Sequence, residues 1–257
     1  MGALEFLFGA GLLAGAMNAL AGGGTFVTLP ALIAVGVPSV EANASSTVAL
    51  YPGGFASAWA YHERPEERRG SVCGIAVVKL LGVTVAGGLA GSLLLLRTPS
   101  SSFDRILPWL LLAATLAIAF GRRVSGAARG HRRHAPAGLV LALQLALGVY
   151  GGYFGGAVGL MMVAGWSLMG EDDVKALNGP RTLLVSSTNA VASIAFIVAG
   201  AVRWPETLAV LAGGVIGGYA GARLGRVVPA RVTRVLVLFC TGGMTCVFFG
   251  RAYLGGL

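Results

Sequence analysis

The chain has 257 residues, of which 56% are apolar and only 11% are charged, and its formal net charge is +9. Soluble domains average about 25% charged residues, so this composition excludes an ordinary soluble globular protein and predicts an all-α polytopic membrane protein. The positive charge lies almost entirely in short loops, as the positive-inside rule expects, and does not indicate nucleic-acid binding.

Ten apolar segments follow one another along the chain, and the loops between them carry the charge. A membrane-spanning helix needs about 20 mostly apolar residues, and several of these segments are that long. The N-terminus carries Glu5 and no basic region, so we expect no cleaved signal peptide. The segments cover approximately residues 3–20, 25–37, 43–61, 72–96, 106–120, 137–154, 157–169, 176–200, 206–222 and 232–250.

Glycine interrupts two of the apolar stretches, at Gly22-Gly23-Gly24-Thr25 and, about 135 positions later, at Gly155-Gly156. Such a break frees backbone N–H groups, which are tolerated at membrane depth only where they are buried in protein or line a watery cavity. Paired breaks in corresponding halves of a chain are typical of transport sites. The alternative is that these glycines only allow helices to pack tightly.

A second repeated motif supports a duplication, because Gly87–Gly91 (GGLAG) matches Gly217–Gly221 (GGYAG). We therefore expect two homologous halves. The predicted organisation is an N-terminal repeat (1–120), a basic linker (121–136) and a C-terminal repeat (137–257) within one integral membrane domain.

Charge counting indicates the orientation. The segment 121–134 carries five arginines, which assigns it to the cytoplasm. If the broken elements 3–37 and 137–169 each cross the membrane once, the loops place 10 basic residues inside and 7 outside. If each enters and leaves on the same side, the count becomes 13 inside and 4 outside. The second arrangement is favoured, and it gives inverted repeats, each with a re-entrant helix pair plus three full transmembrane helices.

Polar side chains cluster after each break and would suit an anion. A half-helix that begins inside the membrane presents free N–H groups and a positive dipole end, and hydroxyl, amide and guanidinium groups add donors. Other interpretations remain for these residues: N-caps for Asn43 and Asn178, backbone bonding for the hydroxyls, and snorkelling for Arg181. The predicted substrate-binding residues are Gly22, Gly23, Gly24, Thr25, Asn43, Ser46, Thr47, Gly155, Gly156, Asn178, Arg181 and Asn189.

The sequence lacks the residues that a membrane enzyme would need. No carboxylate or histidine lies deep in a predicted span, so there is no evident acid/base pair or metal site. Cys73, Cys240 and Cys246 have neither metal-binding nor redox spacing, and each is interpreted as a small apolar helix residue. We expect neither enzymatic activity nor a cofactor.

The duplicated order of these motifs resembles the TauE/SafE family of sulfite and organosulfonate exporters, over essentially the whole chain. The closest stretch is ALNGPRTLLVSSTNAVASIAFIVAG, in which Asn178, Arg181 and Asn189 match the family's spacing of Asn, cation and Asn. The first half carries GGGTFVTLPAL and the cluster around Asn43, but it has no cation matching Arg181. The resemblance implies export of a small sulfur-containing anion across the bacterial inner membrane.

We therefore predict a secondary transporter whose partners are a small anion and the lipid bilayer. Two alternatives stay open: an anion channel, and a non-transporting membrane scaffold whose basic loops recruit a cytoplasmic partner. A homodimer is one oligomeric state compatible with the sequence.

Overall fold

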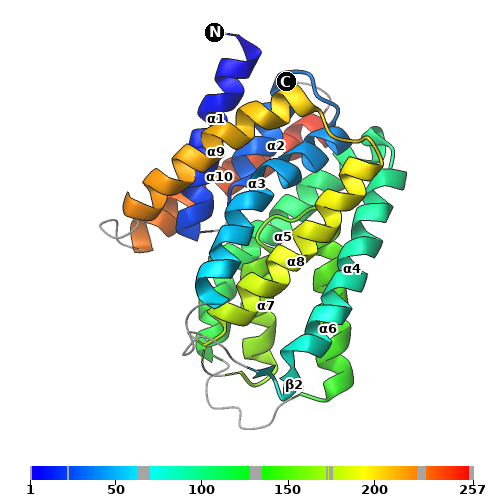
Figure 1. Cartoon of the computed structure of the whole chain (residues 1–257), viewed down its shortest axis with the longest axis vertical. Coiled ribbons are helices and arrows are strands. Elements are labelled where there is room, and N and C mark those ends of the chain that lie inside the picture. The colour runs from blue at the N-terminus through cyan, green and yellow to red at the C-terminus, as the bar shows by residue number, and fades with distance from the viewer. Residues whose placement is uncertain are drawn as a thin grey trace.

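A computed structural model of the chain is almost entirely helical (Figure 1). It describes residues 2–21, 23–62, 70–127, 135–171, 173, 176–224 and 230–254. The ten helices within them are α1 (Ala3–Ala21), α2 (Thr25–Ala34), α3 (Ser39–His62), α4 (Val77–Arg97), α5 (Ser100–Ala127), α6 (Ala137–Tyr153), α7 (Val158–Leu168), α8 (Asn178–Val198), α9 (Trp204–Leu224) and α10 (Ala230–Tyr253).

Three of the described helices are long and apolar enough to cross a membrane by themselves, over Val77–Arg97, Ser100–Gly121 and Asn178–Val198. Several others are apolar but shorter, including α2 and α7. At a rise of 1.5 Å per residue, the ten residues of α2 extend only about 15 Å, half of a hydrocarbon core of about 30 Å. This is the helical, polytopic architecture that the composition predicts.

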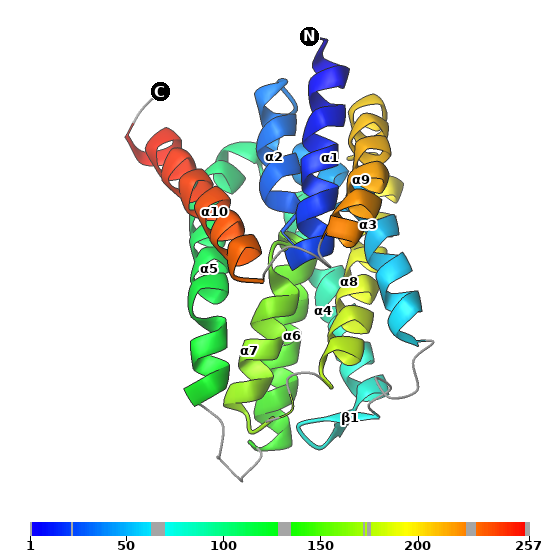
Figure 2. The same cartoon turned by 90° about the vertical axis from the view of Figure 1, so that its left-hand side faces the viewer.

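Both glycine-broken elements fold back on themselves as helical hairpins. The N–H of Ala135, just before α6, donates to the carbonyl of Met169, just after α7, at 3.1 Å. The two ends of this element are therefore adjacent, as a re-entrant pair requires. In Figure 2, α1 runs down from the N-terminus and α2 returns upward beside it, whereas the α6–α7 hairpin opens at the opposite end of the molecule.

Glycine allows the closest helix contacts, which join α1 to α9 and α4 to α6. A Cβ atom on Gly87 of α4 would lie 2.7 Å from the carbonyl oxygen of Leu145 in α6. A Cβ atom on Gly217 of α9 would likewise collide with the carbonyl of Leu12 in α1. The repeated glycines thus have the same role in the α4–α6 and α1–α9 contacts, because they allow the two backbones to come into direct contact.

A buried hydrogen-bond chain fixes the short helix α7 against α4 and α6. The indole Nε1–H of Trp166 donates to Oε1 of Gln144 at 3.1 Å, and Nε2 of Gln144 donates to Oγ1 of Thr84 at 2.7 Å. All three residues have no exposed surface. Because the polar side-chain groups of these three residues all have partners, the residues can be buried without the penalty of unsatisfied donors.

The structure corrects three details of the sequence analysis. Helix α4 begins only at Val77, because a two-stranded hairpin, β1 (Ser71–Val72) and β2 (Ile75–Ala76), precedes it. Cys73 is therefore a turn residue rather than a helix residue, with φ of +50° beside Gly74 at +76°, the conformation of a tight hairpin turn. Helix α5 also continues through Ala127, into the predicted linker, where no proline stops it.

Replacing Gly87 with alanine tests the close contact between α4 and α6. We expect Gly87→Ala to lower the free energy of unfolding by about 1–3 kcal/mol, because the new methyl group would overlap backbone atoms of α6. Gly82, on the same helix, is the matched control, since a Cβ atom there would meet nothing within 4 Å. Melting temperatures in detergent should fall for Gly87→Ala and not for Gly82→Ala; equal melting of both variants would contradict this packing.

The Gln144 chain can be tested by a double-mutant cycle. Gln144→Leu leaves the indole N–H of Trp166 buried without an acceptor, which should cost about 1–3 kcal/mol of stability. Adding Trp166→Phe removes that N–H, so the double variant should lose clearly less stability than the sum of the two single variants. Additive losses in thermal melting would show that the hydrogen bond contributes nothing.

Candidate functional site

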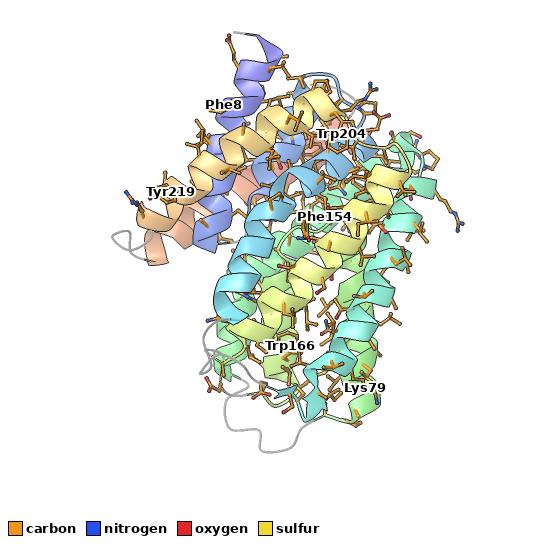
Figure 3. All side chains as sticks on the ribbon, viewed as in Figure 1. Phe8, Lys79, Phe154, Trp166, Trp204 and Tyr219 are labelled. Carbon is orange, nitrogen blue, oxygen red and sulfur yellow. The ribbon has the colours of Figure 1, made fainter. Side chains whose placement is uncertain are left out.

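The two glycine breaks, far apart in the sequence, meet in the interior of the molecule. Phe26, in the first turn of α2, and Phe154, between α6 and α7, have ring centroids 6.4 Å apart, and each side chain is only 1% exposed. Tyr150 packs against Phe154 with a centroid distance of 5.9 Å. Figure 3 shows Phe154 near the middle of the molecule. Gly22 lies outside the described residues.

The second break has the backbone geometry that the glycines predict. Gly155 has φ of +80°, and Ala157, the N-cap of α7, has φ of +58°. These left-handed conformations turn the chain so that α7 can start at Val158 inside the bundle. The first N–H groups of any helix lack intrahelical acceptors, so the N-terminus of α7 directs donors and its positive dipole end toward the interior. Gly156 is buried beside the ring of Phe154.

Two asparagines from different helices converge on this second break. Nδ2 of Asn43, in α3, donates to the carbonyl oxygen of Tyr153 at 3.0 Å. Asn189, in α8, places its Oδ1 3.9 Å from the position that a Cβ atom on Gly155 would occupy. Both residues belong to the predicted site, and the fold brings them to one break from opposite halves of the sequence.

Asn43 leaves an acceptor unused. The residue is 1% exposed, and its Oδ1 has no hydrogen-bond partner among the described residues. The orientation of the amide is determined by its contact, because the Tyr153 carbonyl accepts only and must face the NH₂ group. A buried polar atom without a partner is costly, so Oδ1 marks a position where a ligand group can bind.

The first break is closely packed as well. A Cβ atom on Gly24 would lie 2.9 Å from the carbonyl oxygen of Ala14, so a close helix contact requires glycine there. Gly23 is also buried, and Thr25, which begins α2, is half-buried. Just beyond the break, the hydroxyl groups of Thr28 and Ser46 share a hydrogen bond and connect α2 to α3.

Arg181 lies against the second half-helix. Its Cγ and Cδ atoms are each 3.4 Å from where a Cβ atom on Gly159 would stand, which places the side chain over the first turn of α7. Arg181 is half-buried, as is Asn178, the first residue of α8. Asn43 and Asn178 are not N-caps. Helix α3 already begins at Ser39, four residues before Asn43, and Leu177 is the N-cap of α8.

Several hydroxyl groups in the polar clusters bond to the helix backbone. Thr47 donates to the carbonyl of Asn43 at 2.9 Å, and Thr182 donates to that of Asn178 at 2.8 Å. Thr188, one residue before Asn189, donates to the carbonyl of Leu184 at 3.0 Å. Each of these hydroxyls has committed its proton locally, and only its lone pairs remain for other partners.

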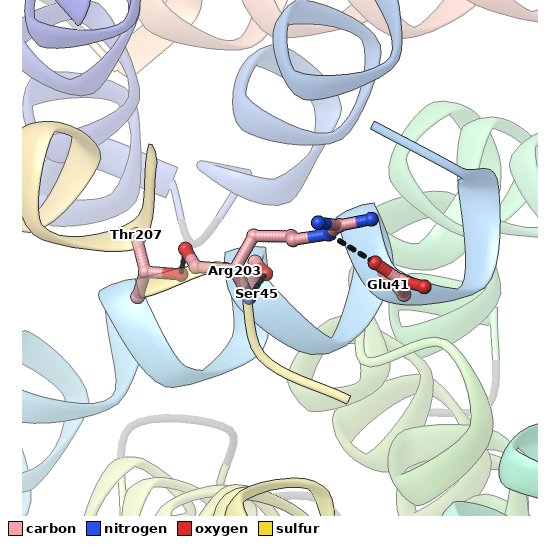
Figure 4. Close-up of polar contacts among 4 residues, drawn as sticks. All are labelled: Glu41, Ser45, Arg203 and Thr207. Carbon is pink, nitrogen blue, oxygen red and sulfur yellow. Dashed lines mark hydrogen bonds and ion pairs between the residues drawn. The ribbon is translucent and has the colours of Figure 1, made fainter. Parts of the chain in front are cut away.

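Ser45 serves the connection between α8 and α9 instead of the breaks (Figure 4). Its Oγ accepts the backbone N–H of Arg203 at 3.0 Å, while the Arg203 side chain pairs with Glu41 of α3. Thr207 donates back to the Arg203 carbonyl at 2.6 Å. This contact joins α3 to the start of α9 at the surface.

Some residues at the breaks carry no sequence signal of their own. Nothing in the sequence distinguishes Phe26 and Phe154 from other apolar residues, although each lies within two residues of a glycine break. Thr28 falls in a short apolar run, and Gln144 is an isolated amide in α6. Within the described ranges, no three His, Cys, Asp or Glu side chains are arranged to hold a metal ion.

Comparison with known proteins places this fold in a family. The family model described as "Sulfite exporter TauE/SafE" matches residues 7–247. A "Probable membrane transporter protein ORF9" of Sinorhizobium sp is 28% identical over 236 residues, covering 91% of this chain and 88% of that protein. A "Probable membrane transporter protein" of Haemophilus influenzae is 26% identical, with 94% and 92% covered.

A third relative, the "Probable membrane transporter protein YfcA" of Escherichia coli K12, is 29% identical, with 86% of this chain and 80% of YfcA covered. No solved structure matches significantly. The resemblance noted in the sequence is thereby confirmed, as is the expectation of a multi-pass membrane protein from a transporter family that is not enzymatic. The chain belongs to the TauE/SafE sulfite exporter family.

Proposed function

We propose that the protein is a secondary transporter that exports a small sulfur-containing anion, sulfite or an organosulfonate, across the bacterial inner membrane. One observation carries this proposal: the amides of buried Asn43 and half-buried Asn189 converge on a helix break in the interior, and Oδ1 of Asn43 has no hydrogen-bond partner among the described residues. Polar groups and irregular backbone at such depth are expensive unless they serve a cavity or a ligand.

The helix pairings support two inverted repeats, covering residues 1–120 and 137–257. The contact of α1 with α9 has its counterpart in that of α6 with α4, the contact of α3 with α9 in that of α8 with α4, and the contact of α2 with α10 in that of α7 with α5. The two hairpins open toward opposite ends (Figure 2). With the linker 121–134 in the cytoplasm, the broken elements would enter the membrane from opposite sides.

In the proposed site the anion lies beside the N-terminus of α7. The first-turn N–H groups of α7 and the guanidinium of Arg181 would supply the positive field, while Asn43 and Asn189 orient the ligand. Ser46, Thr47, Gly23, Gly24 and Thr25 would line the approach from the first break. Asn178, one turn before Arg181 in α8, would line the approach along that helix. The contact of Phe26 with Phe154 would separate the two breaks in this conformation and open as the halves rock.

The unused Oδ1 of Asn43 adds a requirement on the substrate. A carbonyl oxygen can only accept a hydrogen bond, so the favoured ligand should carry an O–H or N–H group in addition to its anionic oxygens. Hydrogensulfite and hydroxyl- or amino-bearing sulfonates meet this requirement, whereas simple alkanesulfonates do not.

The membrane potential can drive this export. A potential that is negative inside favours anion efflux by about 2.3 kcal/mol per charge per 100 mV. No coupled ion is then needed.

Arg181→Ala should lower saturable sulfite flux into proteoliposomes at least tenfold, because losing a charge-assisted hydrogen bond of about 1.4 kcal/mol already costs that factor. Arg181→Lys should retain part of the flux, and Arg97→Ala, at the exposed end of α4, should retain all of it. Flux that does not saturate would favour a channel. The scaffold would be favoured if no anion were transported and if recruitment of a cytoplasmic partner were abolished by charge reversal within 122–133 but not by Arg181→Ala.

Paired sulfonates test the role of Asn43. Wild-type protein should transport 2-hydroxyethanesulfonate with a kcat/KM at least tenfold above that of ethanesulfonate, because a site built around a hydrogen bond rejects an analogue that cannot form it. In Asn43→Leu both values should fall, because the hydrogen bond to the Tyr153 carbonyl is lost as well, and they should become equal to each other. Equal transport of both compounds by the wild type would show that Oδ1 does not contact the substrate.

A further inference from the structure

A cavity of about 230 Å³ lies between the first turn of α5 and the last turn of α10, two helices that contain neither glycine break. A cavity needs only about 10–15 Å³ of such volume to hold one water molecule, so this one has room for a small polar headgroup. It is lined by Ser101, Asp104, Arg105, Phe248, Arg251 and Ala252.

Three charged side chains face this cavity without partners. Arg105, Arg251 and Asp104 are exposed, and none of them forms an ion pair or a side-chain hydrogen bond within the part of the chain that the structure describes. By contrast, Arg203 on the same end of the molecule is paired with Glu41. Two free guanidinium groups suit a phosphate, and a free carboxylate beside them suits an ammonium group.

An aromatic cluster adjoins the charged cavity. The indole Nε1–H of Trp109 donates to the hydroxyl of Tyr253 at 3.0 Å, and that hydroxyl donates to the carbonyl of Arg105 at 3.0 Å. The ring of Phe249 packs against both, with its centroid 5.1 Å from that of Trp109 and 5.9 Å from that of Tyr253. Trp109 and Tyr253 are 55% and 54% exposed. Half-exposed Trp and Tyr side chains are typical of the membrane–water interface.

Apolar stripes lead away from the cavity along both helices. The exposed apolar side chains on α5 recur every three to seven residues, at Ile106, Trp109, Leu116 and Phe120. On α10 they recur at Val247, Phe239 and Val235. In a multi-pass membrane protein these stripes contact acyl chains, so a headgroup in the cavity would have its tails in place beside them.

We propose that this cavity binds the headgroup of phosphatidylethanolamine. The guanidinium groups of Arg105 and Arg251 hold the phosphate, with the Ser101 hydroxyl as a further donor, and the carboxylate of Asp104 accepts hydrogen bonds from the primary ammonium. The acyl chains lie along α5 and α10 below Trp109. Asp104 selects this headgroup: phosphatidylglycerol offers no cation, and the quaternary ammonium of phosphatidylcholine offers no N–H donor.

Native mass spectrometry of the purified protein in detergent, titrated with each of the three lipids, tests the proposal. Wild-type protein should bind phosphatidylethanolamine at least fivefold more tightly than phosphatidylglycerol or phosphatidylcholine. The double variant Arg105→Ala/Arg251→Ala should lose tight binding of phosphatidylethanolamine, and Asp104→Asn should remove its advantage over phosphatidylglycerol. Arg97→Ala, a change to an exposed arginine outside the cavity, should bind as the wild type does.

The result that overturns the proposal is equal binding of the three lipids, tighter binding of phosphatidylglycerol, or binding that Asp104→Asn leaves unchanged. Soluble phosphoethanolamine provides a further arm. It should compete weakly, because it lacks the acyl chains; competition as strong as that of the lipid would show that the cavity is a site for a free metabolite. Sulfite flux plays no part in this readout, so the result is independent of the transport proposal.

Discussion

A backbone carbonyl or N–H buried in an apolar interior must find a partner, and this requirement organises the centre of the molecule. At the end of α6 the carbonyl of Tyr153 is satisfied by a side chain from another helix, the amide of Asn43, and not by the next turn of its own helix. That single bond lets α6 stop, allows α7 to start in a new direction, and fixes α3 beside the break. It also leaves half of an amide unused, which makes the same residue both a structural support and a candidate ligand contact.

The local features of the fold could be predicted from the sequence because they depend on local chemistry. Gly155 has a positive φ at the second predicted break, and the duplicated glycine motifs make equivalent close helix contacts at Gly87 and Gly217. The short segments after each break are too short to span a bilayer, and they form short helices.

The choice of partners could not be predicted, for a physical reason. Lipid tails are as apolar as leucine, so a helix face that packs on protein and one that contacts lipid have the same composition. Nothing in α5 distinguishes buried Leu111 from exposed Leu116. The hydrogen-bond partners of hydroxyl groups are equally hard to predict from the sequence. Ser45 and Ser46 are neighbours, yet Ser45 accepts a hydrogen bond from the backbone N–H of Arg203, and Ser46 shares one with Thr28. Tertiary geometry alone separates them.

The pairing of α1 with α9 has a consequence for how the protein is made. Helix α1 has its most extensive contact with a helix that lies nearly 200 residues later in the chain. At roughly 5–20 residues per second, α1 would spend on the order of 10–40 s in the membrane with its glycine face uncovered. During that time the glycine face contacts lipid or a temporary partner, which α9 later displaces. The α4–α6 pair, separated by one helix, can form almost as soon as it is synthesised.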